Sequence, residues 1–159
     1  MHETISLRPE TDDDLEFTAR LYASTREEEL RPVDWPDEQK VAFLRQQFDA
    51  QRLHYRQHYD FAEFWIIVDD GVPVGRLYIH RHGNDVRLMD IGLMPDHRGR
   101  GIGEMLVKRI LDAAAAEGKS VSIHVEMFNP AMSLYQRLGF KQIDTYGVYH
   151  LMEWRPGVS

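Results

Sequence analysis

A glycine-rich segment that opens with an arginine is the part of the chain best suited to chemistry. Residues 98–103 read Arg-Gly-Arg-Gly-Ile-Gly and follow a β-rich segment that ends near Leu93. Glycines permit a tight turn, and the first N–H groups of the helix expected to follow have no partners within that helix. The helix dipole and the nearby arginines favour negative charge at such a turn. The segment therefore predicts a binding site for a phosphorylated ligand.

Two other phosphate-binding motifs fit this chain less well. A dinucleotide-binding loop has the pattern G-x-G-x-x-G, whereas the glycines here stand at 99, 101 and 103. Gly118-Lys119-Ser120 resembles the end of a P-loop, but Ala113 replaces the leading glycine and the triplet follows a predicted helix. A glycine turn that serves packing alone remains the alternative to a ligand site.

The elements that must position this turn are strands and helices in a mixed order. The expected strands cover residues 5–8, 64–68, 74–80, 86–93, 120–126, 140–145 and 148–154. Apolar spacing predicts helices over residues 12–24 and 130–138, one from Pro36 to about Tyr59, and one that follows the turn and ends near Gly118. This order predicts an α+β fold with one mixed sheet and helices on its faces.

Several local patterns make sharper structural predictions. Thr11 and Asp14 resemble a capping box at the start of the first helix, and residues 26–36, which contain two prolines, are expected to form a loop. Apolar faces are expected on two helices, and the tryptophans are expected mostly in the core. The residues concerned are Val41, Leu44, Phe48, Tyr55 and Tyr59, then Leu106, Ile110, Leu111 and Ala113, and finally Trp35, Trp65 and Trp154.

The composition indicates one folded domain, residues 1–159. The chain has no cysteine, which excludes disulfide scaffolds and thiolate catalysis and favours a cytoplasmic location. It has no apolar run of the roughly 18 residues that a membrane helix needs, and we expect no membrane association. The net charge of −7 argues against a nucleic-acid partner and is compatible with a cationic substrate such as an amine.

Two histidine pairs have spacings that are compatible with metal binding. His54 and His58 are four residues apart on a predicted helix, and His80 and His82 share one face of a predicted strand. A His-Glu-x-x-His motif is absent and the sequence indicates no third ligand. We therefore expect solvent-facing histidines and no metal site.

Two sequence blocks together resemble the GNAT superfamily of N-acetyltransferases. Residues 98–103 match its R/Q-x-x-G-x-G/A signature after a strand that ends in Leu93-Met94-Pro95. Residues 129–140, Asn-Pro-Ala-Met-Ser-Leu-Tyr-Gln-Arg-Leu-Gly-Phe, resemble its N-P-A-x-x-L-Y-x-x-x-G-F segment. The resemblance implies a mostly antiparallel central sheet of about seven strands flanked by about four helices. It also implies transfer of an acetyl group from acetyl-CoA, as co-substrate, to a primary amine in a ternary complex.

The resemblance assigns roles to particular residues. The turn would hold the pyrophosphate of CoA, the pantetheine arm would follow the strand end at 91–94, where that strand separates from the next, and a backbone N–H near Leu93 would polarise the thioester carbonyl. Tyr135 would donate its proton or a hydrogen bond to the leaving sulfur, or would only pack beneath the cofactor. The cofactor-binding set is Ile91, Leu93, Met94, Arg98, Gly99, Arg100, Gly101, Ile102, Gly103, Asn129 and Tyr135.

The general base and the acceptor are less determined by the sequence. Asp90, His124 and Glu126 are candidate bases, with Glu126 the first of them. The acceptor is a small-molecule or peptide amine, which the acidic residues 27–29, Asp34 and Asp37 could attract, and the resemblance also allows a homodimer. A CoA-binding regulatory module without turnover is the main alternative function, and a nucleotide-dependent oxidoreductase is a third.

Overall fold

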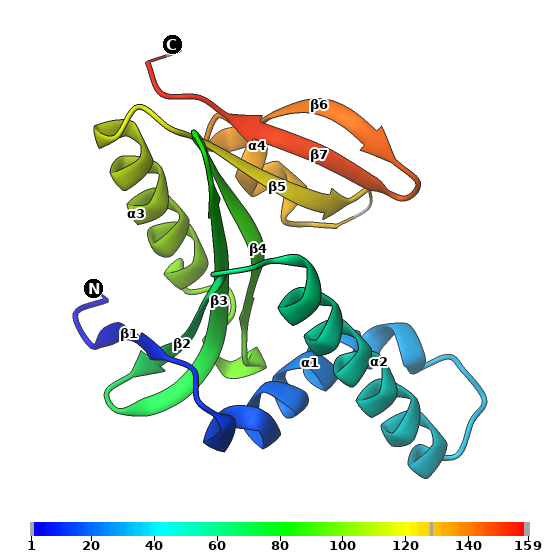
Figure 1. The fold of residues 1–159 in the computed structure, drawn as a ribbon. Coiled ribbons are helices and arrows are strands. Elements are labelled where there is room, and N and C mark those ends of the chain that lie inside the picture. The colour runs from blue at the N-terminus through cyan, green and yellow to red at the C-terminus, as the bar shows by residue number, and fades with distance from the viewer. Residues whose placement is uncertain (1, 128, 158–159) are drawn as a thin grey trace. The chain divides into compact units, whose positions relative to one another are not determined.

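The computed structural model describes residues 2–127 and 129–157 as a seven-stranded sheet with four α-helices (Figure 1). Neighbouring strands follow the order β1-β2-β3-β4-β5-β7-β6. The strands are β1 Ile5–Pro9, β2 Glu63–Asp69, β3 Val72–His82, β4 Asp85–Leu93, β5 Ser120–Glu126, β6 Lys141–Tyr146 and β7 Tyr149–Trp154. The helices are α1 Leu15–Leu30, α2 Asp37–His58, α3 Ile102–Ala116 and α4 Met132–Arg137, with short 3₁₀ turns at Asp12–Asp14 and Pro95–His97. The predicted α+β fold with a mixed, mostly antiparallel sheet is confirmed.

The chain divides into two compact units, and we describe each by itself. The first comprises the residues up to 77 together with 92–98, and the second comprises 78–91 together with the residues from 99 onward. Strands β3 and β4 therefore contribute residues to both units. The single domain over 1–159 stays a prediction of the sequence.

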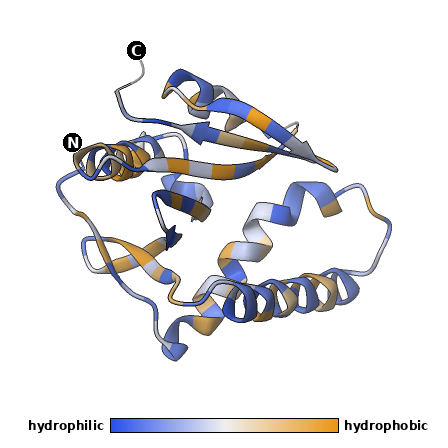
Figure 2. Ribbon diagram, turned by 45° about the horizontal axis from the view of Figure 1, so that its top comes forward, coloured by the Kyte–Doolittle hydropathy of each residue, from blue (hydrophilic) through white to orange (hydrophobic). Residues whose placement is uncertain are grey.

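In the first unit, β1 pairs antiparallel with β2, from Ile5 opposite Asp69 to Pro9 opposite Trp65. Helices α1 and α2 lie side by side, and their contact includes the rings of Tyr22 and Phe48, whose centroids are 5.9 Å apart. Figure 2 shows both helices as largely hydrophilic, with hydrophobic residues interspersed. The predicted apolar stripe on α2 is therefore wrong in part, because Val41 is 67% exposed while Phe48 is buried.

Helix α1 is longer than the sequence pattern predicts. It continues through Leu30 instead of ending near Ser24, so the predicted loop over 26–36 is wrong for its first part. The stretch Arg26-Glu27-Glu28-Glu29-Leu30 consists of good helix formers, and Arg26 and Glu29 form an ion pair one turn apart at 3.1 Å. The helix stops just before Pro32, since proline cannot continue it.

The start of α1 is anchored by Asp14. Its carboxylate accepts two 2.8 Å hydrogen bonds from the Arg8 guanidinium and one of 2.8 Å from the Thr11 N–H. The predicted reach of the Asp14 side chain back to Thr11 is thus confirmed, although the first turn is a 3₁₀ helix. The Arg8 hydrogen bonds are the main reason that the pKa of Asp14 lies below its ordinary value.

In the second unit, β4 and β5 are parallel, and β7 pairs antiparallel with both β5 and β6. Helix α3 packs on β5 (Figure 1). Its buried side chains are Ile102, Leu106, Val107, Leu111 and Ala114. The expected position of Ala113 in this face is wrong, because Ala113 is exposed and the next alanine is buried instead.

Two further predictions about packing are wrong. Helix α4 covers 132–137 and not the whole of 130–138. The tryptophans do not lie mostly in the core: Trp35 is 37% exposed and contacts Phe43, while Trp65 and Trp154 are half-buried. Across residues 2–127 and 129–157, none of the helices combines the length and apolar character that crossing a membrane requires.

Candidate active site

The turn ahead of α3 carries a row of N–H groups for which residues 2–127 and 129–157 provide no acceptor. Gly99 and Gly101 have φ angles of 72° and 79°, in the left-handed region that favours glycine. The carbonyl of Gly101 accepts the first hydrogen bond of α3, from the N–H of Met105 at 3.0 Å. Within the described part of the chain, nothing accepts a hydrogen bond from the N–H groups of residues 99–104. These groups are available to an anion.

The turn also has room for a ligand beside its backbone. A Cβ atom placed on Gly99 or Gly103 would meet no heavy atom of the described residues within 4 Å. Arg100 lies exposed between two of the glycines. Unpaired N–H groups, open space and a helix N-terminus together fit the diphosphate of a CoA molecule.

The side chain of Arg98 forms hydrogen bonds within the protein, whereas the sequence suggests a cation that attracts the ligand at the turn. Its Nε donates to the carbonyl of Leu93 at 2.9 Å, and its Nη2 donates to Ser24 Oγ of α1 at 3.1 Å. Sequence reasoning treated this arginine only as a cation beside the turn and missed Ser24 entirely. A serine inside an amphipathic helix gives no sequence signal of such a contact.

Within the first unit, the end of β4 makes close backbone contacts with β3. The N–H of Met94 donates to the carbonyl of Val74 at 2.8 Å. A Cβ atom on Gly75 would lie 2.3 Å from the carbonyl oxygen of Gly92, so only glycine fits there. An isolated glycine within a strand pattern is a signal of close backbone approach, and it could have identified Gly75 from the sequence. The turn Pro95–His97 follows directly, and His97 Nε2 lies 3.1 Å from Asp69 Oδ2.

Strands β4 and β5 pair only along their first residues. Their register runs from Asp85 opposite Ser120 to Leu88 opposite Ile123, whereas β4 continues to Leu93 and β5 to Glu126. The strand separation that the family resemblance implies agrees with this register. Ile91 therefore lies on β4 beyond the last residue that pairs with β5.

Tyr135 is a buried phenol on α4. Its side chain is 5% exposed and its ring packs edge-on against Phe140, with centroids 5.6 Å apart. Burial raises the pKa of Tyr135 to about 12, and the negative charge of Asp90 acts in the same direction. The phenol therefore remains protonated at neutral pH and can donate a hydrogen bond.

Asn129 closes the turn that leads into α4. Its Oδ1 accepts a hydrogen bond from the N–H of Ala131 at 2.8 Å, and its carbonyl accepts one from the N–H of Met132 at 3.0 Å. The prediction that Asn129 is the N-cap of this helix is wrong, because the N-cap is Ala131 and Asn129 bonds within the turn that precedes it. The two contacts account for Asn129 by local structure alone.

Among the candidate bases, His124 is poorly suited to accept a proton. Arg87 Nη1 lies 3.2 Å from His124 Nδ1, and because a guanidinium can only donate, the Nδ1 lone pair is occupied. Burial and the charge of Arg87 both lower the pKa of His124. The neutral ring then carries its proton on Nε2, which leaves no free acceptor nitrogen.

Glu126 and Asp90 project from opposite faces of the second unit's strands. Residues that pair directly share a face, and faces alternate along a strand, so Glu126 lies with His124 and Ser122 on β5. Asp90 lies with Leu88 on the other face of β4, and the negative charge of Asp90 helps to raise the pKa of Tyr135. Both carboxylates make contacts within the protein.

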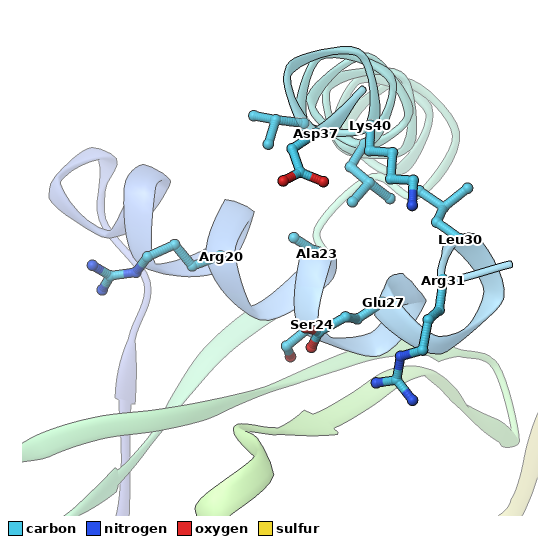
Figure 3. A pocket seen from close by; sticks show the side chains of 10 residues that line it. Arg20, Ala23, Ser24, Glu27, Leu30, Arg31, Asp37 and Lys40 are labelled. Carbon is cyan, nitrogen blue, oxygen red and sulfur yellow. The ribbon is translucent and has the colours of Figure 1, made fainter. Parts of the chain in front are cut away.

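A pocket of about 560 Å³ lies between α1 and α2 in the first unit (Figure 3). Its charged and polar lining residues are Arg20, Ser24, Glu27 and Arg31 of the α1 side and Asp37 and Lys40 of α2. The remaining lining residues are apolar: Ala23, Leu30, Val41 and Leu44.

The two histidine pairs form no metal centre that the described residues complete. The rings of His54 and His58 are 4.5 Å apart and those of His80 and His82 are stacked at 6.0 Å. Residues 2–127 and 129–157 contain no group of three His, Cys, Asp or Glu side chains arranged to hold a metal ion.

Comparison with known proteins identifies the family of this chain. The model of the acetyltransferase (GNAT) family matches residues 19–140. The chain belongs to the acetyltransferase (GNAT) family. It is 30% identical over 119 residues to mycothiol acetyltransferase of Corynebacterium glutamicum strain R, an alignment that covers 73% of this chain and only 40% of that relative. It is 35% identical over 81 residues to peptidyl-lysine N-acetyltransferase YjaB of Salmonella typhimurium, covering 50% of this chain and 51% of that protein.

Solved structures of acetyltransferases share the fold of this family member. PaiA N-acetyltransferase of Thermoplasma acidophilum, solved with coenzyme A, superposes with a TM-score of 0.72 at 20% identity, covering 95% of this chain and 98% of that one. Spermidine N-acetyltransferase of Vibrio cholerae, solved with CoA and spermine, gives a TM-score of 0.63 at 17% identity, covering 96% and 95%. At these identities the likeness concerns the fold alone.

Proposed function

We propose that this chain transfers an acetyl group from acetyl-CoA to a primary amine by direct attack in a ternary complex. One observation carries the proposal: the family's signature turn has N–H groups at 99–104 with no acceptor among the described residues. Acetyl-CoA supplies an activated thioester. The N–H groups of the turn hold its diphosphate, and the open space beside Gly103 admits it.

The end of β4 and α4 supply the groups that act on the thioester. The Leu93 N–H donates to the carbonyl oxygen, on which negative charge grows during attack. The Tyr135 hydroxyl donates a hydrogen bond to the departing sulfur. With a pKa of about 12 this phenol is a weaker acid than a thiol, whose pKa is near 8.5, so it stabilises the sulfur without giving up its proton.

Glu126 is the proposed general base. It ends β5 beyond the last residue that pairs with β4, and its carboxylate can take the ammonium proton through a water molecule. His124 is the weaker candidate because its Nδ1 faces Arg87. Glu126→Gln should lower kcat more than Asp90→Asn does, whereas a larger loss of kcat in Asp90→Asn would assign the role to Asp90.

The pocket between α1 and α2 is the proposed acceptor site. Glu27 and Asp37 suit a cationic amine, and Arg20, Arg31 and Lys40 suit an anionic group elsewhere on the same molecule. We therefore expect acceptors that carry both charges, such as amino acids or short peptides. A cytoplasmic location, a homodimer and the lack of a nucleic-acid partner remain predictions of the sequence.

Two measurements test the function. Calorimetry should detect CoA binding, and thiol release from acetyl-CoA should appear with part of a panel of amino acids, peptides, polyamines and aminoglycosides.

Gly103→Val should weaken CoA binding at least about tenfold by filling the space beside the turn. Ala113→Val, at an exposed site on the same helix, is the matched control. Equal CoA affinity in both variants would refute diphosphate binding at the turn. CoA binding without turnover of any amine would favour the regulatory module.

A further inference from the structure

Arg98 joins two parts of the first unit that the sequence separates widely. Its guanidinium donates from Nε to the Leu93 carbonyl at 2.9 Å and from Nη2 to Ser24 Oγ at 3.1 Å. The Ser24 hydroxyl donates in turn to the Leu21 carbonyl at 2.7 Å. Because that bond uses the only hydroxyl proton, the Ser24 oxygen is left to accept from Arg98. The three groups form a chain from α1 to the end of β4.

The far end of this chain is the Leu93–Met94 peptide, which directly follows the peptide whose N–H the proposed mechanism uses. Arg98 donates to the Leu93 carbonyl at one edge of this peptide, and the Met94 N–H donates to the Val74 carbonyl from the opposite edge. The preceding peptide is confined where the Gly92 carbonyl meets Gly75. A hydrogen-bond donor assists a reaction most when its direction is set in advance, so contacts at this strand end govern how the Leu93 N–H is aimed.

The near end of the chain is in the wall of the α1–α2 pocket. Ser24 lines that pocket beside Ala23 and Glu27. Ser24 is therefore shared between the pocket lining and the hydrogen bond from Arg98. The guanidinium is bonded to the protein through both Nε and Nη2.

We propose that Arg98 is a positioning residue that couples the α1–α2 pocket to the end of β4. An acceptor in the pocket holds Ser24 and Arg98 in place, and Arg98 holds the Leu93–Met94 peptide, which adjoins the peptide that carries the Leu93 N–H. The coupling rests on the proposed acetyl transfer. It assigns the signature arginine a role through its side chain that is separate from diphosphate binding by the backbone of the turn.

Ser24→Ala tests the coupling with a matched control one residue away. Thr25 Oγ1 makes the same kind of bond, to the Tyr22 carbonyl at 2.7 Å, and does not contact Arg98, so Thr25→Ala removes an equivalent hydroxyl. We expect Ser24→Ala to lower kcat about tenfold, because the hydrogen bond to the charged Arg98 is lost. The affinity for CoA should not change, because the backbone of the turn binds it. Thr25→Ala should retain wild-type kcat. Ser24→Thr should restore activity, because threonine can both donate to the helix carbonyl and accept from Arg98.

A double-mutant comparison separates positioning from a general loss of structure. In an Arg98→Ala background, Ser24→Ala should have no further effect on kcat, whereas additive losses would overturn the coupling. Arg98→Ala should also leave the calorimetric affinity for CoA within about twofold of wild type. A large loss of that affinity would mean that the guanidinium binds phosphate, which also overturns the proposal.

A readout that needs no turnover keeps the two proposals distinct. In amide NMR spectra of the free protein, Ser24→Ala should shift the Leu93 and Met94 resonances, and Thr25→Ala should not. If the wild-type protein turns over no amine, the proposed function fails while this measurement still stands. If the wild type is active and the two variants give the same kinetics and spectra, the coupling alone fails.

Discussion

Tyr135 shows how the surroundings of a residue decide what its chemistry can be. A tyrosine at this place in the Asn-Pro-Ala segment suggests a proton donor, and a phenol of ordinary pKa would be close enough to a thiol for proton transfer. Burial against Phe140 and the charge of Asp90 raise the pKa of Tyr135 to about 12 and favour hydrogen-bond donation instead. The sequence could suggest the residue, but only the fold determines its acidity.

Replacing Tyr135 with Phe should lower kcat about tenfold to a hundredfold, because the departing sulfur loses its donor. CoA affinity should change little, since the ring remains in place. Steady-state kinetics together with calorimetry measure both quantities. Tyr149→Phe, at a tyrosine that is 41% exposed on β7, is the control. An unchanged kcat in Tyr135→Phe would leave the residue with a packing role only.

The raised pKa of Tyr135 also sets the direction of a stability change at high pH. The unfolded chain releases this proton near pH 10 and the folded chain near pH 12, so the folded state binds more protons between these values. Its contribution is complete below pH 10 and is lost as the pH rises toward 12. In Tyr135→Phe this part of the alkaline loss should be missing from urea unfolding curves.

At the level of elements, strands were easier to predict than helix ends. A short run of aromatic and β-branched residues such as 64–68 favours a buried strand, and β2 includes that run. The extension of α1 through Arg26–Leu30 was missed because two nearby prolines outweighed a run of good helix formers. The Ser24–Arg98 contact spans 74 positions, and a hydroxyl within a helix carries no pattern that would reveal it.

Asp14→Asn should destabilise the fold through the start of α1. The carboxylate is buried and bonded to both Arg8 and Thr11, so we expect a loss of about 2 kcal/mol in the free energy of unfolding. Asp13→Asn, at an exposed neighbour, is the control. Because the folded pKa of Asp14 is lowered, its stabilisation is present above about pH 4 and lost as the pH falls through the folded pKa. The acid sensitivity of Asp14→Asn should be correspondingly weaker in urea titrations.

Gly75→Ala tests how tightly β3 approaches the end of β4. The new Cβ would lie 2.3 Å from the Gly92 carbonyl oxygen, so the backbone must shift, at a cost of roughly 1 to 3 kcal/mol in urea unfolding. Gly92→Ala offers the comparison, since a Cβ there meets no atom of the described residues within 4 Å. Equal stability of the two variants would show that this strand end tolerates displacement.

At the level of the whole molecule, cofactor binding should appear as added stability. A ligand present at 100 times its Kd stabilises a folded protein by about 2.7 kcal/mol, which for a chain of this size raises the Tm by roughly 5 to 10 °C. We expect CoA to produce this shift in thermal unfolding, with at most about half of it in Gly103→Val. NAD at the same concentration should have no effect, and a shift with NAD but not CoA would support the oxidoreductase alternative.

The edge strand β6 affects how the protein behaves at high concentration. All six residues of β6 are exposed, and their pairing with β7 slips between Gln142 and Asp144, where Ile143 is skipped. A bulge of this kind breaks the regular ladder along a sheet edge, and the charges of Lys141 and Asp144 flank the break. A strand of another protein copy therefore meets an irregular row of backbone groups at β6. This irregularity opposes strand-by-strand aggregation at this edge of the sheet.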